Sequence, residues 1–220
     1  MSAACCRPST HGTANFFSRW SKSYARRFRK GKLEKVQRYL LDGIRLGSVN
    51  AKSVLDIGCG VGALHLTLLK EGARQATGID LSGGMLDQAR RFAGLMGVEE
   101  RTKYVQGDFV EQADSVAPAE ITMLDKVVCC YEDVGTLVRK STEKTLDLFA
   151  VSHPRENFLV EFGFKIEIAL SKLFRAQFHP YWHNWGDVQR MIVECGFDLL
   201  YHNSTFAWNV VVYRRQKLAA

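Results

Sequence analysis

The chain lacks the long apolar runs that mark membrane proteins. No stretch of its 220 residues approaches the roughly 18 apolar residues of a membrane-spanning helix, and its N-terminus has no continuous apolar segment of a secretory signal. The six cysteines follow no zinc-ligand or disulfide spacing, being two adjacent pairs and two single residues: Cys5-Cys6, Cys129-Cys130, Cys59 and Cys195. We therefore expect a cytoplasmic protein with no membrane span and no metal centre, in which most cysteines are small buried hydrophobes and a nucleophilic role stays open.

Acidic residues are scarce in one N-terminal segment. Between Asn15 and Arg38, nine lysines and arginines are opposed by Glu34 alone, so this segment has a charge of +8 and the rest of the +7 chain is close to neutral. Such a segment can bind nucleic acid, an anionic membrane surface or an acidic substrate, or it can be a solvated helix face. The charge alone leaves these alternatives open.

The same segment carries aromatic residues at helical spacing: Phe16, Phe17, Trp20 and Tyr24. They predict an amphipathic helix over residues 15–29, followed by a second helix over residues 33–46. We expect residues 1–14, which are small, polar and aperiodic, to be disordered, and residues 15–47 to form a basic helical lid. Residues 48–220 then suit one domain.

The most informative motif is the stretch Val54–Gly62, in which a buried strand ending in a carboxylate precedes three glycines in five positions. Glycine has no Cβ, so Gly58, Gly60 and Gly62 let the backbone turn sharply and approach a ligand closely. The glycines also satisfy a loose dinucleotide pattern, but Asp56 would repel a pyrophosphate. A ligand with an ammonium group would be attracted instead, and S-adenosylmethionine carries one on its methionyl end.

Further acids follow two other predicted strands. Asp80, in the motif Gly78-Ile79-Asp80-Leu81-Ser82, is placed to accept hydrogen bonds from both ribose hydroxyls of an adenosine cofactor. Asp108 and Phe109 are placed to bind the adenine amino group and to cover the base. Alternatively, Asp56 and Asp80 are helix caps, Asp108 is a cap or turn residue, and Phe109 belongs to the core.

The rest of the pattern alternates strands and helices. We expect strands over residues 53–57, 75–79, 103–106, 126–131 and 157–162, helices over 63–71, 84–95, 135–150 and 185–194, and late strands over 197–204 and 206–214. This order predicts an α/β fold with a mostly parallel seven-stranded sheet and a C-terminal antiparallel hairpin. Sheets of this kind bind ligands at the carboxyl ends of their strands.

Together, the motifs at residues 54–62, 78–82 and 107–109 and the segment 125–131 resemble, in order and spacing, those of class I S-adenosylmethionine-dependent methyltransferases. The resemblance runs over roughly residues 52–214 and implies the Rossmann-like class I methyltransferase fold, an N-terminal helical lid and S-adenosylmethionine as cofactor. It implies that Asp56, Gly58 and Gly60 hold the methionyl moiety, Asp80 the ribose, and Asp108 with Phe109 the adenine. The candidate cofactor-binding residues are Tyr24, Asp56, Gly58, Cys59, Gly60, Asp80, Leu81, Gly107, Asp108, Phe109 and Cys130.

The candidate catalytic residues are His179, His183 and Tyr131. A protonated acceptor would need a general base, and the two histidines lie in the segment 165–186, which we expect to be a cap that forms the substrate wall. Tyr131 and Glu132 follow a predicted strand and are placed to contact substrate. Tyr24 resembles the lid tyrosine of small-molecule methyltransferases, which reaches the cofactor carboxylate, although an aromatic stripe can equally be core.

The chain also has a distant likeness to the magnesium-protoporphyrin O-methyltransferase branch, which methylates a carboxylate. We therefore expect an enzyme that transfers a methyl group to the O, N or S atom of a small molecule, either anionic or aromatic. Two alternatives stay open: a methyltransferase that reaches RNA or protein through the basic segment, and a non-catalytic adenosine-ligand-binding protein. The sequence predicts neither the acceptor nor the oligomeric state.

Overall fold

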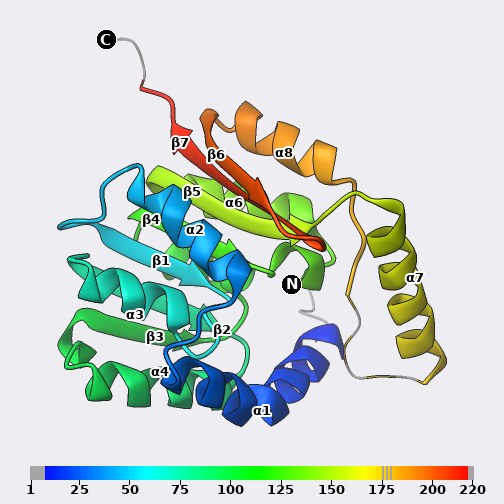
Figure 1. The fold of residues 1–220 in the computed structure, drawn as a ribbon, viewed down its shortest axis with the longest axis horizontal. Coiled ribbons are helices and arrows are strands. Elements are labelled where there is room, and N and C mark those ends of the chain that lie inside the picture. The colour runs from blue at the N-terminus through cyan, green and yellow to red at the C-terminus, as the bar shows by residue number, and fades with distance from the viewer. Residues whose placement is uncertain (1–7, 175, 177, 179, 218–220) are drawn as a thin grey trace, which may run out of the picture.

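Seven strands form one sheet at the centre of the molecule. The computed structural model describes residues 8–174, 176, 178 and 180–217. The strands are β1 Ser53–Ile57, β2 Gln75–Asp80, β3 Thr102–Gln106, β4 Ala119–Asp125, β5 Thr145–Pro154, β6 Phe197–Ser204 and β7 Trp208–Arg215. They lie in the order β3-β2-β1-β4-β5-β7-β6 (Figure 1), and β7 pairs antiparallel with both of its neighbours. This is the predicted Rossmann-like methyltransferase fold with its C-terminal antiparallel hairpin.

Helices cover both faces of the sheet. The longer ones are α1 Pro8–Arg29, α2 Lys35–Arg45, α3 Ala63–Lys70, α4 Gly83–Leu95, α6 Val134–Glu143, α7 Phe158–Leu173 and α8 Trp185–Glu194, and short turns include α5 Phe109–Gln112 and η3 Val128–Cys130. One core packs α2, α3 and α4 on one face of the sheet, and a second packs α5, α6 and α8 on the other. Neighbouring residues of β1 alternate between them, with Val54 in the first and Leu55 in the second. The central strands are therefore apolar on both faces.

The predicted strand over residues 126–131 is wrong. The fourth strand, β4, ends at Asp125, and the chain turns at Lys126, whose φ is +61°. Cys130 N–H then donates to Val127 O at 2.8 Å, which closes a 3₁₀ turn. The Val-rich run after Asp125 has strand composition, but a left-handed residue at its start breaks the strand. Cys129 and Cys130 therefore lie in a turn at the carboxyl end of the sheet.

The predictions for the helix and the strand that follow this turn are also wrong. The helix expected over residues 135–150 ends at Glu143, and the buried strand β5 begins at Thr145. The strand expected over residues 157–162 is the first part of α7, because Asn157 caps this helix by accepting from Val160 N–H at 2.9 Å. The first part of the real fifth strand thus lies inside the predicted helix.

The N-terminal helix is longer than the sequence predicted. It begins at Pro8, so residues 8–14, which we expected to be disordered, are helical, and residues 1–7 lie outside the described chain. Proline suits a first helical turn, where its fixed φ is already helical. Further along, α1 packs against α4 through the edge-to-face pair of Phe28 and Phe92 and the 2.8 Å hydrogen bond between Ser18 Oγ and Ser82 Oγ. The predicted second helix is α2.

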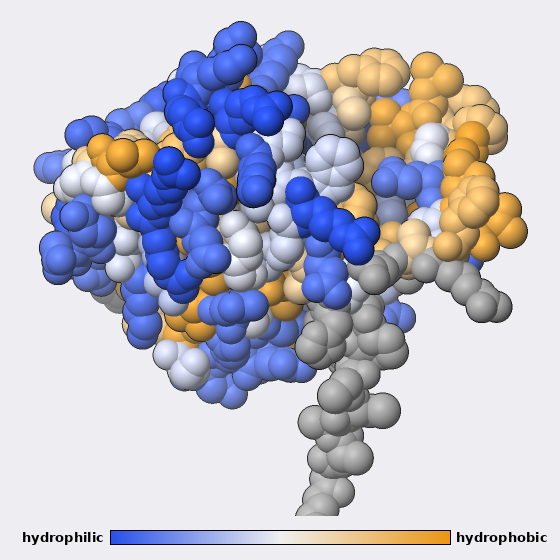
Figure 2. Space-filling model, turned by 90° about the horizontal axis from the view of Figure 1, so that it is seen from below, coloured by the Kyte–Doolittle hydropathy of each residue, from blue (hydrophilic) through white to orange (hydrophobic). Residues whose placement is uncertain are grey.

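The helix α7 stands apart from the layered body. It follows β5 and leads into the connection to α8 at one side of the molecule, so the predicted cap 165–186 spans its second half and that connection. Seen from below, the surface over α7 is hydrophobic while much of the surrounding surface is hydrophilic (Figure 2). In the part of the chain that the structure describes, no helix combines the length and apolar composition of a transmembrane span.

Candidate active site

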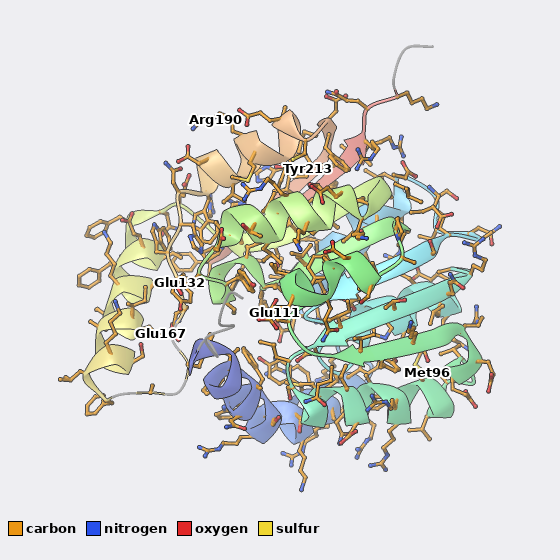
Figure 3. The ribbon with its side chains drawn as sticks, turned by 180° about the vertical axis from the view of Figure 1, so that it is seen from behind. Met96, Glu111, Glu132, Glu167, Arg190 and Tyr213 are labelled. Atoms are coloured by element: carbon orange, nitrogen blue, oxygen red, sulfur yellow. The ribbon has the colours of Figure 1, made fainter. Side chains whose placement is uncertain are left out.

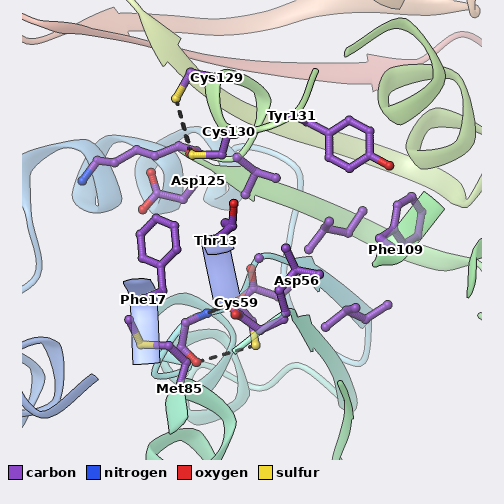
Figure 4. A pocket seen from close by; sticks show the side chains of 18 of the residues that line it. Thr13, Phe17, Asp56, Cys59, Met85, Phe109, Asp125, Cys129, Cys130 and Tyr131 are labelled. Carbon is purple, nitrogen blue, oxygen red and sulfur yellow. Dashed lines mark hydrogen bonds between the residues drawn. The ribbon is translucent and has the colours of Figure 1, made fainter. Parts of the chain in front are cut away.

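A cavity of about 450 Å³ opens at the carboxyl ends of the central strands. Its walls come from the loops after β1, β2, β3 and β4, and from α1 and α7. This volume lies in the range of small-molecule and cofactor pockets. Every predicted cofactor-binding residue contributes to the wall, as does Tyr131. Figure 4 shows Asp56 and Cys59 on one side of this space, and Tyr131 and Phe109 on another.

The glycine loop forms one end of the cavity. Gly58, Gly60 and Gly62 all have positive φ, at +67°, +53° and +83°. Gly58 N–H and Cys59 N–H both donate to Ile79 O, at 2.7 and 3.0 Å, which fastens the loop to the tip of β2. A Cβ on Gly58 would come within 2.4 Å of the Val127 side chain, whereas a Cβ on Gly60 would meet open space. Gly60 therefore leaves room in the cavity wall that any other residue would fill.

This difference gives a matched test. Gly97 has nearly the same backbone conformation, φ +64°, and equally open space at its Cβ, but it does not line the cavity. We expect Gly60→Leu and Gly97→Leu to lower the melting temperature by similar amounts, because each forces a left-handed residue at a cost of about 1–2 kcal/mol. Only Gly60→Leu should weaken S-adenosylmethionine binding, by about tenfold or more, when measured by calorimetry. Equal binding in both variants would contradict the assignment of the loop.

Asp80 anchors the loop with both carboxylate oxygens. Gly60 N–H donates to Oδ2 and Ser82 N–H donates to Oδ1, each at 2.8 Å. Burial raises the pKa of Asp80 to about 6, while the two backbone N–H groups act in the opposite direction. Each carboxylate oxygen keeps a second lone pair that a ribose hydroxyl can use.

The raised pKa of Asp80 predicts a pH dependence. Ribose hydroxyls that donate to the ionised carboxylate lower its pKa in the complex, so binding of the cofactor releases a proton below about pH 6. Affinity for S-adenosylmethionine should then fall by about tenfold for each pH unit below 6 and level off above it. Calorimetry across this range measures the slope. The Asp80→Asn variant should lose the slope, and its persistence there would assign the effect to another group.

Asp56 is held by a histidine that the sequence analysis did not single out. Both side chains are buried, and His65 Nδ1–H donates to Asp56 Oδ2 at 2.8 Å. On the other side of the ring, His65 Nε2 and the Tyr104 hydroxyl are hydrogen-bonded at 3.0 Å. The chain from Tyr104 through His65 fixes the orientation of the Asp56 carboxylate at the cavity wall. His65 lies one helical turn into α3, a position that identifies it only once the helix is placed beside β1.

Removing this histidine should cost stability. The variant His65→Leu leaves the carboxylate of Asp56 buried without its donor, so the free energy of unfolding should fall by about 1–3 kcal/mol. The variant Tyr104→Phe removes the outer bond to His65 and the 3.3 Å bond to Ala89 O but keeps the bond to Asp56, and should cost about 1 kcal/mol. Urea unfolding of the purified proteins measures both. A larger loss for Tyr104→Phe would contradict the role of the Asp56 bond.

Asp108, in the predicted adenine site, has both of the places that the sequence left open: it is a helix cap and it is part of the cavity wall. Asp108 caps the short helix α5 by accepting from Val110 N–H at 2.8 Å, and it also lines the cavity. The Tyr131 hydroxyl donates to the same carboxylate, 3.0 Å from Oδ2. Phe109 is buried in the second core and still reaches the cavity wall. The structure therefore brings Tyr131, which was predicted to contact substrate, together with Asp108 and Phe109.

Three cysteines line the cavity: Cys59, Cys129 and Cys130. Burial, and then the nearby Asp56 carboxylate, raise the pKa of Cys59 well above its usual range. A thiol with a raised pKa is a poor nucleophile, so Cys59 is a small side chain of the cavity wall. Cys130 lies in the wall with its Sγ–H donating to Lys126 O at 3.2 Å, and Cys129 and Cys130 are free thiols.

A charged cluster missed by the sequence analysis lies opposite the glycine loop. Lys126 forms an ion pair with Glu34 and lies 5.5 Å from the ring centre of Trp208. Asp125, at the end of β4, accepts from Ser152 Oγ at 2.7 Å, and burial raises its pKa while Lys126 lowers it. All of these residues except Ser152 line the cavity. Asp125 is an acid at the end of a strand, which is the same signal that identified Asp80. The sequence analysis missed it because the predicted strand began at residue 126, after Asp125.

Of the two histidines predicted as general bases, the structure describes His183 alone. His179 lies outside the described residues. His183 does not line the cavity, its Nε2–H donates to Tyr131 O at 2.9 Å, and burial lowers its pKa. Glu132 is exposed and also outside the cavity wall, whereas Glu167 of α7 contributes to it (Figure 3). The geometry therefore gives no support to His183 and does not test His179, whereas Tyr24 and Tyr131 line the cavity.

Comparisons with known proteins agree with this geometry. Residues 54–150 match the family described as a methyltransferase domain. A release factor glutamine methyltransferase of Chlorobaculum tepidum is 41% identical over 64 residues, which are 29% of this chain and 22% of that protein. A ubiquinone biosynthesis O-methyltransferase of Serratia proteamaculans is 39% identical over 85 residues, 39% of this chain and 32% of that protein. The chain thus spans a third or less of the length of these relatives.

A solved structure resembles the whole fold. Magnesium protoporphyrin IX methyltransferase from Synechocystis, with bound SAH, has a TM-score of 0.68 at 18% identity, covering 94% of this chain and 100% of that one. At such identity the likeness shows a shared fold. The distant likeness predicted from the sequence is thereby confirmed at the level of architecture.

The match of residues 54–150 to a methyltransferase domain and the shared fold agree with the predicted resemblance to class I S-adenosylmethionine-dependent methyltransferases. S-adenosylmethionine is the cofactor of that class, and the residues present fit it. Gly60 leaves open the space that a Cβ would fill, and Asp80 presents a partly buried carboxylate beside it. Bound here, the cofactor supplies an electrophilic methyl group on a sulfonium.

Proposed function

We propose that the protein transfers a methyl group from S-adenosylmethionine to a small molecule with an aromatic or apolar body. One observation supports this most: a single cavity joins the glycine loop and Asp80 to an aromatic wall. That wall comes from α1, α7, the connection after α7 and β7, and consists of Phe16, Phe17, Phe164, Phe178 and Trp208. Methyl transfer gains from such an enclosed, water-poor site.

The charges of the wall favour the aromatic alternative over the anionic one. Beyond the predicted cofactor residues, the wall contains three carboxylates, Glu34, Asp125 and Glu167, and the single cation Lys126 among the described residues. Lys126 already pairs with Glu34 and lies beside Asp125. An anionic acceptor would meet more repulsion than attraction here. The exposed basic residues of α1 lie outside this wall.

Asp125 is the group that we assign to proton removal from the acceptor. It lies at the carboxyl end of β4, lines the cavity, and has a pKa raised by burial. A carboxylate with a raised pKa is a stronger base than an exposed one. Ser152 Oγ–H holds its Oδ1 at 2.7 Å and so fixes the carboxylate plane. Tyr131 and Trp208 would position the acceptor ring.

A product assay tests the proposed function. The protein is incubated with S-adenosylmethionine and a panel of aromatic phenols, amines and carboxylates, and mass spectrometry identifies the methylated product. We expect methylation of at least one phenol or amine and accumulation of S-adenosylhomocysteine. Tight cofactor binding with no transfer to any member, alongside methylation of RNA or protein in the same buffer, would favour the macromolecular alternative.

A further inference from the structure

The outer face of α7 is an exposed apolar stripe. Its large side chains recur every three or four residues along the helix and are 43% to 78% exposed: Phe158, Leu159, Phe162, Ile166, Leu170, Leu173 and, just past its end, Phe174. The opposite face accounts for the packing of the helix, because Val160 is buried and Phe164 contacts Trp182 and Trp208. The hydrophobic surface in Figure 2 is this outer stripe, which lies over α7. Contiguous exposed apolar surface of this extent marks an interaction site.

The apolar stripe continues onto α1. Phe178, in the connection after α7, stacks on Phe16 at 5.1 Å between ring centres and meets Phe17 edge-on at 5.3 Å. Trp20, one turn further along α1, is 52% exposed. The connection after α7 is thus joined to the middle of α1 by aromatic contacts. Together they form one face, and Trp and Phe are the side chains typical of a boundary between water and hydrocarbon.

The same face is basic along α1. The exposed cations of this helix and of the turn after it are Arg19, Lys22, Arg26, Arg27, Arg29, Lys30 and Lys32. Glu34 is the one acidic residue in the sequence between residues 15 and 38, and it already pairs with Arg27 and Lys126. Figure 2 shows hydrophilic surface near the hydrophobic surface of α7 when the molecule is viewed from the side of α1. The proposed methyl transfer does not use these cations.

We propose that this face docks on the surface of a lipid bilayer that contains anionic headgroups. The apolar stripe of α7 would enter the boundary between headgroups and acyl chains, and the α1 cations would bind the headgroups. The charge pattern selects this occupant. A second copy of the chain would bring two strongly basic α1 segments side by side, and nucleic acid would attract the cations but leave the apolar stripe in water.

Vesicle sedimentation with two triple variants tests the docking surface. The first, Phe162→Ser with Leu170→Ser and Phe174→Ser, removes three apolar side chains spread along the stripe. The second, Arg26→Gln with Arg29→Gln and Lys30→Gln, removes three cations. Wild-type protein should bind vesicles of phosphatidylcholine mixed with phosphatidylglycerol, and added salt should weaken the binding. The cation variant should bind about 100-fold more weakly, since each Lys or Arg contributes about 1 kcal/mol, and the stripe variant should lose binding to a similar extent.

Matched controls separate this surface from general stickiness. Leu95 and Leu199 are 71% and 60% exposed on other elements, so Leu95→Ser with Leu199→Ser should leave vesicle binding unchanged. The variant Arg74→Gln with Arg190→Gln, whose side chains are 59% and 70% exposed, should do the same. Absence of wild-type binding to the mixed vesicles would overturn the proposal. So would a dimer in sedimentation velocity that the stripe variant abolishes without any vesicle binding, or RNA binding by α1 in place of vesicle binding.

Discussion

Replacing Asp80 with alanine is expected to weaken S-adenosylmethionine binding by about 100-fold to 10,000-fold, the largest loss of affinity that we predict for a single substitution in this cavity. Two hydroxyl donors of the ribose lose a charged acceptor, and each such hydrogen bond contributes about 1.5–3 kcal/mol. Gly60 N–H and Ser82 N–H also lose their acceptors, both of which lie at 2.8 Å in the structure. The glycine loop then loses its attachment to the residue after β2.

Calorimetry measures this loss, and the chain offers a control nearby. Asp87 lies on α4 with its side chain 74% exposed, so Asp87→Ala removes the same charge without touching the cavity. That variant should bind within about twofold of the wild type, because an exposed ion pair contributes at most about 1 kcal/mol to stability. Binding by Asp80→Ala that stays within threefold of the wild type would contradict the cofactor assignment.

The second large effect is on turnover. Replacing Asp125 with asparagine should lower kcat by about 100-fold to 10,000-fold, the range that a positioned general base contributes. The carboxamide keeps the size of the side chain and still accepts from Ser152 Oγ–H, so KM and cofactor affinity should change little. Steady-state kinetics with the acceptor found in the product assay separates kcat from KM.

Two comparisons make the Asp125 result specific. Asp114 has a 95% exposed side chain outside the cavity, so Asp114→Asn should leave kcat unchanged. The kcat of the wild type should rise with pH through the pKa of Asp125, and Asp125→Asn should lose that limb of the profile. If the loss of activity in Asp125→Asn disappears at saturating S-adenosylmethionine, Asp125 acts only through cofactor binding and has a structural role.

The residues predicted to bind the cofactor could be picked out from the sequence because their signals are local, and the structure places all of them in one cavity wall. The strand β1, the three glycines and Asp80 lie close together in the sequence. The sequence alone therefore identifies the acid at the tip of each strand and the glycine turn between them. The predicted bounds of β1 and α8 match the structure, and those of α3 and α4 agree within one residue at each end.

The acceptor half was not predictable in the same way. Its residues meet only after the chain has folded: Glu34 belongs to the start of α2, Lys126 follows β4, and Trp208 opens β7. The left-handed backbone of Lys126 has no sequence signal of the kind that glycine gives. Because the fourth and fifth strands were misplaced, Asp125 was not assigned to a strand tip.

The hydrogen bond between Ser18 and Ser82 has a thermodynamic consequence. Ser82 N–H donates to Asp80, and the Ser82 hydroxyl lies 2.8 Å from the Ser18 hydroxyl of α1. A single residue therefore connects Asp80 to the basic helix α1. If occupancy of one of these places changes the free energy of that connection, reciprocity requires an equal change in affinity at the other. A surface that immobilises α1 would then raise the affinity of the Asp80 site for a nucleoside, and a nucleoside bound at Asp80 would raise the affinity of α1 for the surface by the same factor.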